Sequence, residues 1–308
     1  ISEYPNIFSH VLGYTSRSDD EFKSMPEIPR SHWRDAELVY AHGLIKGRTG
    51  LEEIYEDHLS GSPGKRVYEI NARGKLVQSL SFIEPSQGAD LYTNLDIEAQ
   101  KSAAKFLGNR RGAVVAIDLD SGGINVLYSS PTYSINQLSN GMNEDDFQTL
   151  INDSDKPFFN RALQGRYPPA STIKPAIGMY GILNNIVNWD FEMKDPGFFE
   201  LPETGRVFRG WRKGGHGKVN MHKAFLVSSN TYFFSLAYQA DIEELSNHLF
   251  SLGFGQKVCK DCYDEDQALV PTPEWKYSVM NAGWVKGDTV NLGIGQGYLL
   301  ATPMQLAN

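Results

Sequence analysis

Two adjacent prolines ahead of a serine constrain the fold of this 308-residue chain more than any other feature. They lie in the stretch YPPASTIKP, residues 167–175. Proline lacks the backbone N–H and has a fixed φ, so no helix can run through residues 168–169. A helix can begin only around Ala170 or Ser171, with Pro175 in its first turn, where the missing N–H costs little. The sequence therefore predicts an abrupt loop-to-helix junction at Ser171.

Ser171 and Lys174 are three residues apart at this junction, so both side chains project from one helix face. The positive end of the helix dipole stabilises a serine alkoxide, and a neutral lysine amine can serve as its base. Lowering a lysine pKa from about 10.4 to near 7 costs roughly 4–5 kcal/mol, which burial and nearby positive charge or dipole must supply. The plainer interpretation is a capped helix start with a surface lysine. The two prolines favour catalysis.

A second polar feature, Ser228-Ser229-Asn230, interrupts an otherwise apolar stretch at residues 224–236. Ser228 could relay a proton between Lys174 and a leaving amine, and Asn230 could hydrogen-bond a substrate amide. The alternative is a turn between two helices in which these residues only cap the helix ends.

Composition excludes several classes of protein. The 41% hydrophobic and 21% charged residues are typical of a globular protein. The net charge of -8 argues against nucleic acid as the main partner. No run of 18 apolar residues appears, so the sequence contains no span for a bilayer. The chain begins ISEYP, without an initiator methionine or signal peptide, and we expect it to be a fragment.

The chain divides by residue composition and hydrophobic pattern into residues 1–88 and 89–308. The first part is polar and rich in Gly, Pro and Ser, which predicts an extended, partly β module; helical spacing occurs at 51–59 and strand alternation at 67–70 and 76–82. In the second part we expect an α+β domain with helices packed on an antiparallel sheet. Its expected helices are 97–107 (capped by Asn94 or Asp96), 171–185, 221–239 and 242–252; its strands are 112–118 and 123–128, followed by a long polar connection to Asn160.

Cys259 and Cys262 lie in a Cys-Lys-Asp-Cys stretch whose flanks predict a loop. A redox CxxC would be expected between a strand and a helix, and a zinc site would need a second ligand pair. We therefore expect spectator thiols or a loop disulfide. Gly293-Ile294-Gly295-Gln296-Gly297 is interpreted as close backbone packing beside a cleft, since no nucleotide-binding signature follows it.

SxxK followed by SxN is a signature of β-lactamases and penicillin-binding proteins. Two further stretches accompany it, GDTVNLGIGQGYLLATPMQLA at 287–307 and YEDHLSG at 55–61. Together these motifs resemble the class B penicillin-binding proteins, most closely the penicillin-binding protein 2 type of the rod-elongation machinery. The resemblance covers essentially the whole chain.

The resemblance implies a penicillin-binding-protein/serine β-lactamase-like transpeptidase domain over 89–308, with a pedestal or dimerisation-like module over 1–88. Ser171 would be the acylated nucleophile and Lys174 its base. Ser228 and Asn230 would form the second motif, in which many relatives carry Asp in place of Asn. The family's third motif, Lys-Ser/Thr-Gly, is absent from the chain, so we expect the domain to be C-terminally incomplete.

The resemblance raises the question of a metal, since some relatives hold zinc near the second motif. His216, in a Gly-Gly-His-Gly loop, could bind a metal with Asp195 and a further ligand. The positions where that ligand would be expected hold Gly210, Trp211 and Ala224. We therefore expect neither metal nor cofactor, and we interpret Trp211 as a core or cleft-wall residue.

The implied function is a peptidoglycan D,D-transpeptidase that cross-links stem peptides during cell elongation and is the target of β-lactams. Its expected partners are a SEDS-type, RodA-like glycosyltransferase and elongation scaffold proteins. A missing N-terminal helix would anchor the protein in the inner membrane, with this part in the periplasm. Two alternatives stay open: a serine β-lactamase or β-lactam sensor, and mainly a scaffold that activates the glycosyltransferase.

The helical spacing at 51–59 predicts an amphipathic helix in the first module. Such a face in a module with little core predicts a docking surface, and the alternative is that it packs on the module's own strands. Its apolar members are Leu51, Ile54, Tyr55 and Leu59, and its acidic members are Glu52, Glu53, Glu56 and Asp57.

Overall fold

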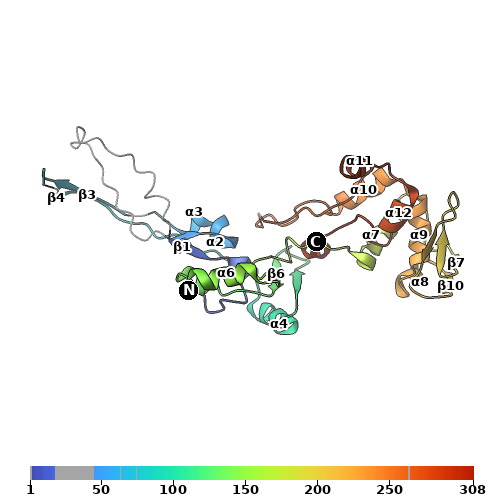
Figure 1. Cartoon of the computed structure of the whole chain (residues 1–308), viewed down its shortest axis with the longest axis horizontal. Helices are drawn as coiled ribbons and strands as arrows, with labels where there is room; N and C mark the ends of the chain where they lie inside the picture. Colours follow the sequence, from blue (N-terminus) through green and yellow to red (C-terminus); the bar gives the residue numbers. More distant parts are fainter. Residues whose placement is uncertain (1, 18–44, 63, 74, 263) are drawn as a thin grey trace. The chain divides into compact units, whose positions relative to one another are not determined.

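The computed structural model describes residues 2–17, 45–62, 64–73, 75–262 and 264–308. Contacts divide the chain into two compact units (Figure 1). Unit 1 comprises Ile1–Asn160 with Asp261–Tyr263, and unit 2 comprises Arg161–Lys260 with Asp264–Asn308. Every paired strand in the described ranges belongs to a two-stranded antiparallel sheet.

Unit 1 contains the sheets β1–β2, β3–β4 and β5–β6 with short helices around them. Its strands are β1 (Thr15–Arg17), β2 (Ile45–Gly47), β3 (Lys65–Ile70), β4 (Leu76–Ile83), β5 (Gly112–Ile117) and β6 (Ile124–Ser130). Its helices are α1 (Ser9–Leu12), α2 (Gly50–Ile54), α3 (Glu56–Leu59), α4 (Ile97–Leu107), α5 (Ile135–Ser139) and α6 (Glu144–Asn152).

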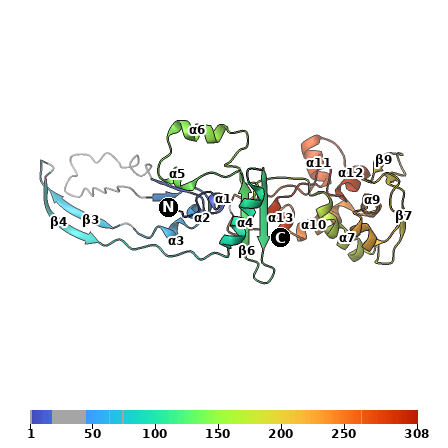
Figure 2. The same ribbon diagram turned by 90° about the horizontal axis from the view of Figure 1, so that it is seen from below.

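Helix α4 packs on the β5–β6 hairpin (Figure 2). Asp96 caps the helix by accepting a hydrogen bond from the Ala99 N–H, as one of the two predicted caps. The buried Gln100 side chain donates to the Leu127 carbonyl and accepts from the Leu127 N–H, so it takes the place of a strand partner for β6. This helix and both strands confirm the elements predicted between residues 97 and 128.

The β3–β4 hairpin is long (Figure 1). Every residue of β4 is exposed, although Leu76, Leu80 and Phe82 are apolar. Both strands were predicted from their alternation. An isolated two-stranded ribbon buries little surface, which agrees with the expectation of a module with little core.

The single helix predicted over 51–59 is wrong in one respect, because Tyr55 separates α2 from α3. The φ of -104° and ψ of 22° at Tyr55 depart from helical values and turn the chain between them. The apolar face predicted there is half-buried. Glu56 points inward and accepts a hydrogen bond from the Gly47 N–H, so it does not belong to an open acidic face.

The polar connection predicted up to Asn160 contains two helices that the sequence interpretation missed, α5 and α6. Side chains of Ser134 and Asn143 cap their N-termini, and three acidic residues in the first turn of α6 favour its dipole. These helices are short and mostly polar, which explains why hydrophobic periodicity did not reveal them.

Unit 2 is mainly helical. Its helices are η3 (Ala170–Ile173, a 3₁₀ turn), α7 (Lys174–Leu183), α8 (Met221–Leu226), α9 (Asn230–Gln239), α10 (Ile242–Ser251), α11 (Pro273–Met280), α12 (Lys286–Leu292) and α13 (Pro303–Ala307). Its strands are β7 (Met193–Asp195), β8 (Phe198–Glu200), β9 (Val207–Arg209) and β10 (Gly217–Val219), paired as β7–β10 and β8–β9.

Helix α9 is the centre of the unit 2 core, with α7 and α12 packed against it. Tyr232, Phe233, Phe234 and Leu236 are all buried, so α9 is apolar on nearly every side, as expected of a core helix. The helix predicted over 221–239 is interrupted at 227–229, because Ser228 has a φ of +50°. The Ser229 side chain then caps α9 by accepting from the Tyr232 N–H.

Candidate active site

Ser171 lies exposed in the 3₁₀ turn η3, and α7 begins three residues later at Lys174. The helix was predicted to begin at Ala170 or Ser171. The position is correct, but the first turn is 3₁₀ rather than α. Pro175 occupies the first turn of α7, as predicted. The side chain of Ser171 is thus presented to solvent at the start of a partly buried helix.

Lys174 is only 2% exposed. Its Nζ donates to the Ser228 carbonyl at 3.0 Å, to Ser228 Oγ at 3.0 Å and to Asn230 Oδ1 at 2.8 Å. The amine also lies 5.3 Å from the ring centroid of Phe233. Burial lowers the pKa of Lys174 to about 8. On the order of a tenth of the molecules would therefore carry a neutral amine at pH 7.

Ser228 connects the buried lysine to the exposed serine. Its hydroxyl lies 3.0 Å from Ser171 Oγ and 3.0 Å from Lys174 Nζ. The structure thus brings together all four residues singled out from the sequence, in the order Ser171, Ser228, Lys174, Asn230. A proton can pass from Ser171 to the lysine through one intervening hydroxyl.

Glycine is required close to the nucleophile. The Ala170 N–H donates to the Gly295 carbonyl at 2.9 Å, so the segment 293–297 packs directly on η3. A Cβ on Gly295 would lie 2.2 Å from the Ala170 carbonyl oxygen, and the φ of Gly295 is +69°. The expectation of close backbone packing beside the site is confirmed.

The two residues considered as metal ligands, Asp195 and His216, contact each other. His216 Nδ1 lies 2.8 Å from Asp195 Oδ2, and Asp195 Oδ1 accepts from the Gly197 N–H. Ser229, rather than a third ligand of metal-binding type, completes the contacts of the carboxylate. Over the ranges that the structure describes, no three His, Cys, Asp or Glu side chains cluster as metal ligands.

The two cysteines are joined to each other in a disulfide and are nearly buried. Of the two expectations, the structure selects the loop disulfide over free thiols. Glu265 supports this loop by accepting hydrogen bonds from the Val258 and Cys259 N–H groups, both at 2.8 Å.

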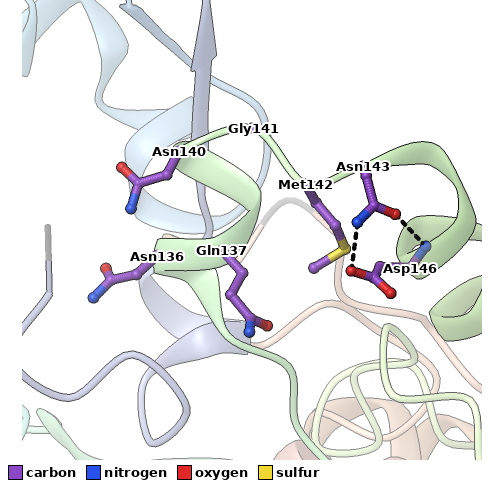
Figure 3. A pocket seen from close by; sticks show the side chains of 7 residues that line it. All are labelled: Asn136, Gln137, Asn140, Gly141, Met142, Asn143 and Asp146. Atoms are coloured by element: carbon purple, nitrogen blue, oxygen red, sulfur yellow. Dashed lines mark hydrogen bonds between the residues drawn. The ribbon is translucent and has the colours of Figure 1, made fainter.

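Unit 1 contains a hollow of about 330 Å³ that is lined mainly by polar residues (Figure 3). Its lining contains amides, a methionine, a glycine and a single carboxylate, with no nucleophile. Three of these side chains are already engaged, since Asn136 donates to the Ser2 carbonyl, Asn143 caps α6 and Asp146 accepts from the Asn143 amide. It is lined by Asn136, Gln137, Asn140, Gly141, Met142, Asn143 and Asp146.

Sequence reasoning missed two contacts near the site. Ser229 Oγ donates to Asp195 Oδ2 at 2.7 Å, and Trp211 Nε1 donates to the Val227 carbonyl at 3.2 Å. Trp211 is 64% exposed and so is not the core residue expected as one possibility. These contacts join residues far apart in sequence, and no local spacing signals them.

Comparison with known families gives two matches. The model of the penicillin-binding protein transpeptidase domain matches residues 112–308, and the model of the penicillin-binding protein dimerisation domain matches residues 3–93. No helix within the described parts of the chain is long and apolar enough to cross a membrane.

Two of the similar curated proteins carry the same name. The peptidoglycan D,D-transpeptidase MrdA of Acinetobacter baumannii is 43% identical over 99% of this chain and 44% of its own length. The protein of the same name from Escherichia coli K12 is 35% identical over 99% of this chain and 47% of its own length. The chain thus spans about half the length of the curated relatives it matches.

Solved structures agree. PBP2 of Pseudomonas aeruginosa in complex with WCK 5153 matches with a TM-score of 0.84 and 33% identity, over 99% of this chain and 62% of that one. PBP2 of Helicobacter pylori in complex with MreC matches with a TM-score of 0.86 and 32% identity, over 99% and 55%. The α+β fold and the resemblance stated from the motifs are confirmed, and the chain belongs to the penicillin-binding protein transpeptidase family.

Proposed function

We propose that this chain is part of a peptidoglycan D,D-transpeptidase that cross-links stem peptides during cell elongation and is acylated by β-lactams. The observation that carries the proposal is the hydrogen-bonded path from exposed Ser171 through Ser228 to buried Lys174. The names of the two MrdA relatives support the reaction and the substrate class.

In this mechanism Ser171 Oγ attacks the carbonyl carbon of the penultimate D-Ala of a stem peptide. Its proton passes to Ser228 Oγ, while the proton of Ser228 passes to the neutral Lys174 amine; both hydrogen bonds reverse direction for this step. The C–N bond then breaks, and the proton on Lys174 returns through Ser228 to the leaving D-Ala amine. The amine of a neighbouring stem then attacks the resulting ester, its proton passes to Lys174 and from there through Ser228 to Ser171 Oγ, and Ser171 is released.

Asn230 has two roles in this proposal. Its side-chain oxygen accepts from Lys174 Nζ at 2.8 Å, which fixes the amine beside Ser228. Its amide NH₂ can donate to the substrate peptide.

In a β-lactam the attack of Ser171 Oγ opens the ring amide. The amine stays attached to the acyl group, so the acyl-enzyme persists.

The test uses the full-length protein and a labelled penicillin, with mass spectrometry of the adduct. Label on Ser171 and none in Ser171→Ala is the expected result. Label on another serine, or undiminished labelling of Ser171→Ala, contradicts the assignment. Rapid hydrolytic release of the label would instead identify a serine β-lactamase.

For the domain organisation we propose a pedestal over 1–88 and a transpeptidase domain over 89–308. The matches at 3–93 and 112–308 support this division, although contacts alone group the chain differently, up to Asn160 in unit 1. A membrane helix upstream of residue 1 would anchor the protein in the inner membrane, with this part in the periplasm.

The pedestal is proposed to dock on a SEDS-type glycosyltransferase and on scaffold proteins of the elongation machinery. The H. pylori structure with MreC and a solved peptidoglycan synthase complex, 26% identical with a TM-score of 0.78, support such partners. Glu53→Lys with Asp57→Lys should impair partner binding and polymerase stimulation while penicillin acylation is unchanged. Glu56 is left intact because it supports β2. Unchanged pull-down and glycan polymerisation with a folded protein would reject this face as the docking surface.

A further inference from the structure

We propose that Asp195, His216 and Trp211 are positioning residues that hold the turn around Ser228 from both sides. This inference rests on the proposed function of Ser228 as the proton relay. All three residues lie in unit 2, and none of them forms a hydrogen bond with Ser171 or Lys174.

The conformation of Ser228 needs external support. Its φ of +50° falls in the left-handed region, which costs an L-residue roughly 1–2 kcal/mol. Residues in such conformations persist when their surroundings over-determine them, and they concentrate at active sites. Relaxation of this turn would withdraw the hydroxyl from its place 3.0 Å from both Ser171 and Lys174.

On the N-terminal side of Ser228 the support comes from Trp211. Its indole Nε1 donates to the carbonyl of Val227, the preceding residue, at 3.2 Å. Trp211 is 64% exposed, and its ring lies tilted against that of His216 with the centroids 5.3 Å apart, so this contact adds little to the hydrophobic core. Its main effect is on the orientation of the peptide unit that leads into Ser228.

On the C-terminal side the support comes from Asp195 at the end of β7. Its Oδ2 accepts from Ser229 Oγ at 2.7 Å and from His216 Nδ1 at 2.8 Å, and its Oδ1 accepts from the Gly197 N–H at 2.8 Å. Burial acts to raise the pKa of Asp195, but the hydrogen bonds from Ser229, His216 and Gly197 outweigh it and hold the pKa below its usual value. The carboxylate therefore stays charged and fully engaged.

The loop that carries Trp211 and His216 is itself fastened to α8, the helix that precedes Ser228. Lys223 Nζ donates to the carbonyls of His216 and Lys218, at 3.0 and 2.7 Å, and the His216 N–H donates to the Asp195 carbonyl. Hydrogen bonds thus connect β7, the loop and α8 into one frame, and Ser228 lies in the turn that follows α8. A displacement of about 1 Å at a reacting group can reduce a rate on the order of 10²-fold.

The decisive variant is Trp211→Phe in the full-length protein, because it removes the indole donor, keeps an aromatic ring and lies at an exposed position. Its matched control is Trp189→Phe, at a tryptophan that is 60% exposed in the same unit. We expect the first-order rate constant of penicillin acylation to fall about tenfold in Trp211→Phe and to stay unchanged in the control. The noncovalent dissociation constant and the melting temperature should stay close to the unmutated values in both.

Asp195→Asn should reduce the same rate constant by a similar or larger factor. An NMR signal of the His216 Nδ1 proton should be present in the unmutated protein and lost in this variant, which reports the frame independently of acylation. If Asp195→Asn does not fold, Trp211→Phe decides alone. Acylation of Ser171 in the unmutated protein with unchanged rates in folded variants would overturn this inference only, whereas no acylation of the unmutated protein would overturn the proposed function.

Discussion

Ser228 Oγ lies 3.0 Å from Ser171 Oγ, and the same Ser228 hydroxyl accepts a hydrogen bond from Lys174 Nζ. The base is buried and the nucleophile is exposed, so the intervening hydroxyl is the connection between them. Activation of Ser171 should depend on Ser228 as strongly as on the lysine itself.

Replacement of Ser228 should therefore be costly. Ser228→Ala removes the relay and is expected to reduce the penicillin acylation rate on the order of 10²-fold, within the range of general acid–base catalysis. Ser251→Ala, at an exposed helical serine that bonds only its own helix, is the control. Acylation of Ser228→Ala within threefold of the unmutated rate would show that Lys174 reaches Ser171 without it.

Lys174 should set the pH dependence of acylation. Because only the neutral amine can accept the proton and its pKa is about 8, the rate should rise about tenfold per pH unit below pH 8 and level off above it. Lys174→Arg keeps the charge but stays protonated, so its rate should be at least about 10² lower and lack this rise. An acylation rate of the unmutated protein that stays constant from about pH 6 to about pH 9 would assign the role of base to another group.

Asn230→Asp should shift that profile. The new carboxylate would lie beside the Lys174 amine, where the Asn230 oxygen is at 2.8 Å. An opposite charge at this distance favours the protonated lysine, so the rise should move to higher pH by about 1 unit or more. Asn247→Asp, at an exposed position of α10, should leave the profile in place. Coincident profiles for both variants would mean that Asn230 does not control the charge of Lys174.

Local sequence patterns account for what could be predicted. The prolines before Ser171 and the spacing to Lys174 define one helix start, and the polar triplet 228–230 stands out against apolar neighbours. Alternation and capping likewise predicted α4, β5 and β6. A turn at 228–230 was considered only as the alternative to one helix over 221–239. The left-handed backbone of Ser228 was not predicted, and its neighbours Val227 and Ser229 contact Trp211 and Asp195, which are distant in sequence.

The disulfide between Cys259 and Cys262 should contribute little. A cross-link that closes so short a loop stabilises by about 2 kcal/mol at most in the chain-entropy model. Glu265 holds the loop backbone independently of the sulfurs. We expect Cys259→Ala with Cys262→Ala to lower the melting temperature modestly and to keep the acylation rate. A large loss of acylation in the folded double variant would give the loop a functional role.

Gly295 packs on Ala170, the residue before the nucleophile. Comparing Gly295 with Gly122 distinguishes the effect of backbone strain from that of a steric clash. Gly295 and Gly122 share a φ of +69°, so alanine should cost each site roughly 1–2 kcal/mol in conformational energy. A Cβ at Gly122 meets nothing within 4 Å, whereas at Gly295 it would overlap the Ala170 carbonyl at 2.2 Å. Gly295→Ala should therefore push η3 and Ser171 out of line with Ser228 and reduce acylation on the order of 10²-fold. Gly122→Ala should lose only stability, measured by thermal unfolding, and equal acylation by the two folded variants would mean that η3 tolerates the displacement.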